Sequence, residues 1–179
     1  VRQQLRADYE AAAALCLKVG MSCKELREAT EVELEDKGLS EADLATLGTL
    51  GSVLPALERL FLSESSGSVG PDGVPRLAEG LAAGALPAVT YLAIDGLHVG
   101  DAGASAIAAA LDRGALPRLK ILTMIGAAIG DAALVALAPA LRRLPTLEEL
   151  SLMNNPFGNE GLAALVAPPP PAGTPPPPA

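Results

Sequence analysis

The chain has 179 residues, half of which are hydrophobic, and it carries a formal net charge of -8 at pH 7. This length fits a single domain, and the apolar fraction is ample for a packed core, which excludes an intrinsically disordered chain. The acidic balance argues against nucleic acid as a partner, because binding to phosphates draws on an excess of Lys and Arg.

The first predicted element is an amphipathic helix that ends at Gly20. Its apolar residues recur at helical spacing, at Leu5, Tyr9, Ala12, Cys16 and Val19. The outermost repeat of a solenoid requires a cover, since its core otherwise faces water. We therefore interpret residues 1–24 as a helix that caps the repeats beginning at residue 29.

Five apolar ladders with the spacing of the pattern L-x-x-L-x-L follow this helix. They begin at Ala29, Leu57, Val89, Leu119 and Leu147, so successive starts lie 28, 32, 30 and 28 residues apart. Each ladder precedes a turn and an Ala- and Leu-rich helical stretch, and one strand plus one helix per period is the signature of a solenoid. We predict an α/β fold with about five repeats over residues 25–167.

The predicted helices span 42–50, 74–83, 104–111, 132–144 and 161–166. The turns before them contain Gly, and suitable N-caps are present at Ser40, Asp101, Asp131 and Asn159. Pro139 lies inside the fourth helix, where it is expected to kink the helix or to limit its hydrogen bonding.

The last segment differs from the repeats in composition. Residues 168–179 contain eight prolines, and we predict that they form an extended or disordered tail outside the core. No further helix is predicted after the fifth repeat, so the strand edge at 148–152 is expected to lie bare unless another segment covers it, which indicates either a truncated array or self-association.

The repeated unit consists of L-x-x-L-x-L, a turn, G-D-x-G/A and a helix. It is clearest in VTYLAIDGLHVGDAGASAIAAAL, LKILTMIGAAIGDAALVALAPAL and LEELSLMNNPFGNEGLAALVA. Residues 29–166 thus resemble leucine-rich repeats of the ribonuclease-inhibitor-like subfamily. The resemblance implies a horseshoe with parallel strands on its concave side, helices on its convex side, and protein recognition as its usual role.

The chain departs from the family pattern at the turn after each strand. The family places an Asn there to cap backbone groups, and this residue is present only as Asn155. The corresponding positions of the other repeats hold Lys37, Ser65, Leu97 and Ala127. We therefore expect those turns to be more mobile or to be supported by water.

Strand alternation predicts which side chains lie on the concave face, because successive residues of a strand point to opposite sides of the sheet. Three columns of residues should cross the strands: Glu31, Arg59, Tyr91, Ile121 and Glu149; Glu33, Phe61, Ala93, Thr123 and Ser151; and Glu35, Ser63, Asp95, Ile125 and Met153. Candidate partner-binding residues are sought in these columns.

The columns contain two candidate partner-binding features. An apolar patch is predicted where water is expected, made of Phe61, Tyr91, Ile121, Ile125 and Met153. Exposed apolar clusters often mark partner sites, and the alternative is a terminal segment that covers the patch. An acidic flank is formed by Glu31, Glu33 and Glu35, with Arg59 placed to pair with Glu31. This flank either steers a basic region of the partner or is a solvated face.

The other polar residues give little support for catalysis, a cofactor or a metal site. The single histidine, His98, lies in a turn with Asp95 but without an evident nucleophile. Alternate Glu residues on one strand lie roughly 6.6 Å apart, too far to converge on one ion. Cys16 is expected in the core and Cys23 in a loop, and two cysteines are too few for a disulfide framework.

We interpret the chain as a non-enzymatic protein-interaction module that binds its partner through the concave face. No stretch near the start approaches the roughly 20 apolar residues of a membrane span, so we expect no membrane partner and a cytoplasmic or nuclear location. The resemblance also implies a regulatory alternative, either a GTPase-activating protein similar to Ran-type activators or the sensor segment of a nucleotide-binding immune receptor.

Overall fold

The computed structural model describes residues 2–51, 54–65 and 69–167, with side chains from residue 9 onward. In chain order the elements are α1 (Arg2–Val19), α2 (Cys23–Glu28), β1 (Glu31–Glu35), α3 (Glu41–Leu50), β2 (Arg59–Ser63), α4 (Gly73–Ala82), β3 (Tyr91–Asp95), α5 (Gly100–Asp112), β4 (Ile121–Thr123), α6 (Asp131–Arg142), β5 (Glu149–Ser151) and α7 (Asn159–Val166). Helix α6 continues through Pro139 to Arg142. The proline-rich segment 168–179 and the side chain of Leu5 lie outside the described residues.

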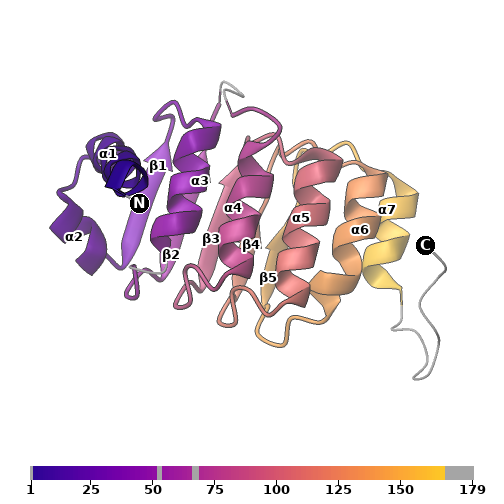
Figure 1. Ribbon diagram of the computed structural model, residues 1–179. Coiled ribbons are helices and arrows are strands. Elements are labelled where there is room, and N and C mark those ends of the chain that lie inside the picture. The colour runs from indigo at the N-terminus through magenta and orange to yellow at the C-terminus, as the bar shows by residue number, and fades with distance from the viewer. Residues whose placement is uncertain (1, 52–53, 66–68, 168–179) are drawn as a thin grey trace.

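The five strands form one parallel sheet in which each strand pairs with the next along the chain, in the order β1-β2-β3-β4-β5. Helices α3 to α7 line up along one face of this sheet, and consecutive helices lie side by side (Figure 1). Each repeat thus adds one strand and one helix to those of the repeat before it. The predicted α/β solenoid is confirmed.

The core lies between the sheet and the helices. In β1, Val32 and Leu34 are buried while Glu33 is exposed, as a strand with one packed face requires. Glycine allows α3 and α4 to come into backbone contact, because a Cβ atom on Gly80 would lie 2.2 Å from Gly48 Cα. Any larger residue at position 80 would push these two helices apart.

Side-chain hydrogen bonds between repeats support the turn that follows β4. Asn155 Oδ1 accepts from the N–H groups of Ala127 and Ile129 at 3.0 and 2.9 Å. The Asn155 amide also donates to the carbonyl oxygen of Met124 at 2.6 Å. The one Asn that matches the family pattern therefore ties the fifth repeat to the fourth.

Other acceptors replace the missing Asn in two further turns. Glu64, one residue before the expected position Ser65, is buried, and its carboxylate accepts from Leu39 N–H at 2.6 Å. After β3, the carbonyl oxygen of Ala127 accepts from Val99 N–H at 3.0 Å. Protein groups thus occupy two positions where support by water was expected.

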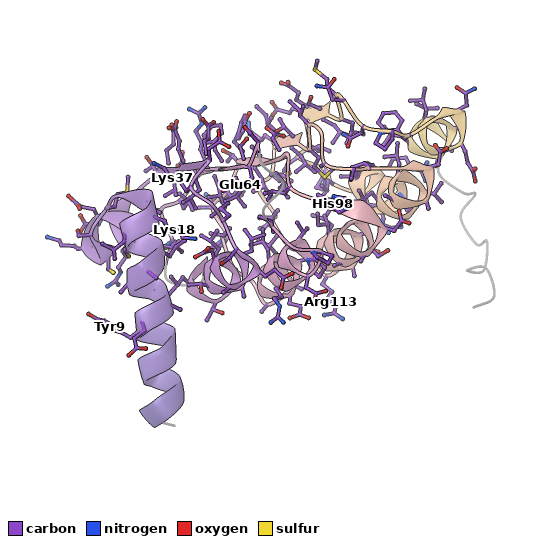
Figure 2. The ribbon with its side chains drawn as sticks, turned by 90° about the horizontal axis from the view of Figure 1, so that it is seen from above. Tyr9, Lys18, Lys37, Glu64, His98 and Arg113 are labelled. Carbon is purple, nitrogen blue, oxygen red and sulfur yellow. The ribbon has the colours of Figure 1, made fainter. Side chains whose placement is uncertain are left out.

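The N-terminal cap consists of the last turns of α1 together with the unpredicted short helix α2. Leu15 and Cys16 of α1 and Leu26 of α2 are buried in the core. The earlier part of α1 extends away from the solenoid (Figure 2), and Tyr9 is 72% exposed. The placement of Tyr9 on a buried stripe is therefore wrong, because α1 overlaps the end of the array only through its last turns.

Candidate functional site

The strand register places the predicted columns across the sheet. Cα partners follow Glu31, Arg59, Tyr91, Ile121 and Glu149 in the first column, and Glu33, Phe61, Ala93, Thr123 and Ser151 in the second. The third column lies within strands at Glu35, Ser63 and Asp95. Its remaining members, Ile125 and Met153, follow the ends of β4 and β5.

A cluster of cationic and aromatic side chains lies on the open face of the sheet. We call Glu31, Arg59, Phe61 and Tyr91 the Arg59 cluster. The ring centroids of Phe61 and Tyr91 are 4.7 Å apart, with ring planes tilted by 35°. Arg59 Cζ lies 5.3 Å from the Phe61 centroid and 5.5 Å from the Tyr91 centroid. Arg59 Nη1 lies 3.0 Å from Glu31 Oε2, so one guanidinium makes two cation–π contacts and an ion pair.

The Arg59 cluster changes the predicted apolar patch. Phe61 and Tyr91 are half-buried, because each ring packs on the other and Arg59 lies over both. Ile121 and Ile125 are half-buried as well. The side chains of these four residues are therefore only partly accessible to solvent.

Small and polar residues interrupt the patch in the middle of the sheet. Ala93, next to Phe61 in the second column, and Thr123, one strand beyond Ala93, are buried. Met153 is 64% exposed but follows β5, three strands away from β2. The structure thus brings Arg59, Phe61 and Tyr91 together and leaves Met153 apart from them.

The hydroxyl of Thr123, which is buried on the open face, has a hydrogen-bond partner in Asp95. Its Oδ2 accepts from Thr123 Oγ1 at 3.1 Å, and its Oδ1 accepts from Ile125 N–H at 2.8 Å. Both carboxylate oxygens therefore brace the next repeat. His98, in the following turn, is exposed.

The acidic flank borders a hollow beside the cap. This open depression, of about 550 Å³, is lined by Val19, Met21, Glu31, Glu33, Glu35 and Lys37. A neighbouring depression of about 500 Å³ has Glu25 and Glu28 in its lining. Carboxylates thus outnumber basic side chains in the lining of both depressions.

An ion pair joins the end of α1 to the start of α3. Lys18, near the end of α1, donates to Asp43 Oδ2 at 2.5 Å and to the carbonyl oxygen of Gly38 at 2.8 Å. Asp43 also closes a capping box with Ser40 at the start of α3. Burial raises the pKa of the Asp43 carboxyl, but hydrogen bonds from Lys18 and Ser40 outweigh burial and hold that pKa below its ordinary value of 3.8. The spacing Ser40-x-x-Asp43 signals the capping box, whereas nothing in the sequence signals Lys18 as its partner.

The two cysteines meet in the cap. Cys16 is buried, and Cys23 is exposed as the first residue of α2. Their Sγ atoms lie 2.7 Å apart. The prediction of Cys23 as a loop thiol is therefore wrong, because the unpredicted helix α2 brings it against Cys16.

The C-terminal end of the array exposes positions that earlier repeats bury. Leu134 of α6 is fully buried, whereas its counterpart Leu162 in α7 is 48% exposed. Val166 is exposed as well, and Leu150 of β5 is only half-buried. Among the described strands, β5 pairs with β4 alone. The apolar side of the last repeat is therefore open in the described part of the chain.

Comparison with known proteins identifies one repeat. Residues 143–166, which include β5 and α7, match a family described as Leucine Rich repeat. A search of curated proteins finds no match to the chain. None of the helices in the described ranges is long and apolar enough to cross a membrane. The match and the sheet topology support a leucine-rich-repeat protein and, in general terms, a protein-interaction module of a kind that is usually non-enzymatic.

Proposed function

We propose that this chain is a non-enzymatic interaction module of the ribonuclease-inhibitor-like type, which binds a partner protein through the open face of its sheet. The Arg59 cluster carries this proposal, because it places an arginine and two aromatic rings together on a face that the helices leave uncovered. Arg and Tyr are enriched among the residues that dominate interface energies. Their mutual contacts also limit the side-chain entropy that binding would cost.

The depression lined by Glu31, Glu33 and Glu35, next to the Arg59 cluster, favours a basic segment of the partner protein. Glu31 is paired with Arg59, whereas Glu33 and Glu35 face solvent. A segment rich in Lys or Arg lying along β1 would pair with these two carboxylates, while an apolar or planar side chain packs on Arg59 and Tyr91. The charges would raise the association rate, and the cluster would lengthen the lifetime of the complex.

Photo-crosslinking in a native lysate tests this face. A photoreactive phenylalanine analogue at Ser63, beside the cluster, is compared with the same analogue at Arg76, which is exposed on α4. We expect a crosslinked protein from Ser63 alone, displaced by excess unlabelled chain but not by an Arg59→Ala/Tyr91→Ala double variant. Equal crosslinking from both positions, or equal displacement by the variant, would contradict the proposal.

The regulatory alternative is tested with the same crosslinked partner. If that partner hydrolyses GTP, its turnover is measured with and without the chain. An interaction module leaves turnover unchanged, whereas a GTPase-activating protein similar to Ran-type activators accelerates it.

We propose a second contact at the open C-terminal end, with another copy of the chain. Its basis is the exposure of Leu162 and Val166 at positions where earlier repeats are packed. Leu162→Glu is expected to abolish a concentration-dependent dimer in sedimentation velocity, while Val135→Glu, at another exposed apolar position on α6, leaves it unchanged. A wild-type chain that sediments as a monomer over the whole concentration range would refute this contact.

A further inference from the structure

The corner between α1 and α2 holds the two cysteines of the chain in contact. Cys16 lies one turn before the end of α1, and Cys23 begins α2, with the two Sγ atoms 2.7 Å apart. Gly20 N–H and Met21 N–H both donate to the carbonyl oxygen of Cys16, at 2.9 and 3.1 Å. Ser22 closes a capping box at the start of α2. Backbone and capping hydrogen bonds therefore fix the approach of the two thiols.

The two thiols differ in their access to solvent. Cys16 is 5% exposed, whereas Cys23 is exposed. Burial, followed by the hydrogen bond with Cys23, raises the pKa of the Cys16 thiol to about 11. A cavity of about 110 Å³ is lined by both cysteines together with Ala12, Leu26, Arg27, Leu50 and Leu54. An external reagent thus meets Cys23 first, with Cys16 directly behind it.

We propose that Cys16 and Cys23 form a dithiol site that reacts with low-molecular-weight disulfides such as oxidised glutathione and closes to an intramolecular disulfide. The Cys23 thiolate attacks one sulfur of oxidised glutathione and displaces a glutathione thiolate, leaving a mixed disulfide on Cys23. Cys16 then loses its proton and attacks Cys23 Sγ, displacing the second glutathione thiolate. The two protons from the cysteines end on two molecules of reduced glutathione, so the protein loses two electrons and the oxidant gains them.

Little movement is required for the second step. A disulfide bond has an S–S length of about 2.05 Å, so the sulfur atoms approach by less than about 1 Å from their separation of 2.7 Å. The bond would join the buried end of α1 to α2 and would leave the open face of the sheet untouched. Oxidation therefore fastens the cap without changing the Arg59 cluster.

Intact-mass spectrometry of the full chain during exposure to oxidised glutathione tests the site. The sequence contains two cysteines, so an intramolecular disulfide has one connectivity and appears as the loss of two hydrogens. Wild type is expected to reach this product with at least roughly tenfold less mixed disulfide than Cys16→Ser, because the second thiol acts intramolecularly. Cys16→Ser should stop as the glutathione adduct on Cys23, and Cys23→Ser should react slowly.

The same reaction in denaturant shows whether the fold positions the two thiols or whether their closeness in sequence is enough for closure. Closure of the mixed disulfide in the folded wild type should be faster than in the urea-unfolded chain by roughly tenfold or more. Circular dichroism checks the fold of each variant, and Cys16→Ala replaces Cys16→Ser if the buried hydroxyl disrupts the cap. A folded wild type that accumulates the glutathione adduct, that forms only intermolecular disulfides, or that closes no faster than the unfolded chain would overturn the proposal.

Discussion

Equivalent ladder residues are buried to different extents at the two ends of the solenoid. At the N-terminal end, α1 and α2 cover the first repeat, and Val32 and Leu34 are buried. At the C-terminal end, Leu150 and Leu152 hold the same ladder positions but remain half-buried. Burial in this fold is therefore supplied by the neighbouring element, and a repeat cannot bury its apolar side alone.

Truncating equivalent leucines should show this difference most strongly. Leu134→Ala removes a fully buried side chain and is expected to lower the free energy of unfolding by about 2–5 kcal/mol. Leu162→Ala changes the counterpart in the next repeat, which is 48% exposed, and should cost less than about 1 kcal/mol. Urea unfolding followed by circular dichroism measures both values. Both are measured at chain concentrations below those that favour the dimer, so equal costs would mean that the C-terminal end is covered even in the monomer.

Helices α3 and α4 pack in backbone contact, which glycine at position 80 permits. Gly80→Ala would place its Cβ atom against Gly48 of the preceding repeat, and the resulting overpacking is expected to cost about 1–3 kcal/mol. Gly130→Ala is a matched control, because no atom lies within 4 Å of its added Cβ. Thermal unfolding should show a clearly lower midpoint for the first variant and a smaller decrease for the second, since Gly130 is the N-cap of α6 and alanine is a poorer N-cap than glycine. A stable Gly80→Ala chain would contradict the close approach of α3 and α4.

The sequence predicts the sheet well because two independent periods agree in it. Alternation within each strand determines which residues face the core, and the spacing of the ladders determines which residues become neighbours across strands. The first two columns follow from these periods alone, and the register confirms them from Glu31 to Glu149 and from Glu33 to Ser151.

Contacts made by long or irregularly placed side chains could not be predicted in this way. Arg59 reaches over rings on its own and the next strand, and its position depends on their packing. Glu64 replaces the family Asn from one residue earlier, so a search at the pattern position misses it. Helix α2 is six residues long, too short to reveal an apolar period. The contact between Cys16 and Cys23 depends on this helix and therefore could not be predicted either.

Acid should weaken the capped end through Asp43. Lys18→Met removes the partner of a buried carboxylate and is expected to cost about 1–2 kcal/mol at neutral pH. The pKa of Asp43 in the folded chain lies below its ordinary value of 3.8. The stabilisation is therefore complete above that value and is lost as the pH falls through the lower folded pKa. Urea unfolding of wild type and variant should converge as the pH is lowered below 3.8.

An exposed ion pair provides the control for this pH dependence. Lys120 and Glu148 lie 3.0 Å apart with side chains that are 53% and 66% exposed. Lys120→Met should therefore change the free energy of unfolding by less than about 0.5 kcal/mol, both at neutral pH and at the acidic pH values used for Lys18→Met. If Lys18→Met behaves like Lys120→Met, the cap is not held by Asp43.

A small change in stability is also expected at the Arg59 cluster, on the open face between the two ends. Arg59→Met keeps an apolar stem over Phe61 and Tyr91 but removes the cation–π contacts and the ion pair with Glu31. Because the Arg59 side chain is 51% exposed, the free energy of unfolding should fall by less than about 1 kcal/mol. Partner affinity should fall by about tenfold or more if the cluster is the anchor, while Arg76→Met on α4 should alter neither quantity. Urea unfolding measures the change in stability. Titration with the partner identified by crosslinking measures the change in affinity. A large loss of stability with unchanged affinity would show that the cluster serves the fold, and that the partner binds elsewhere.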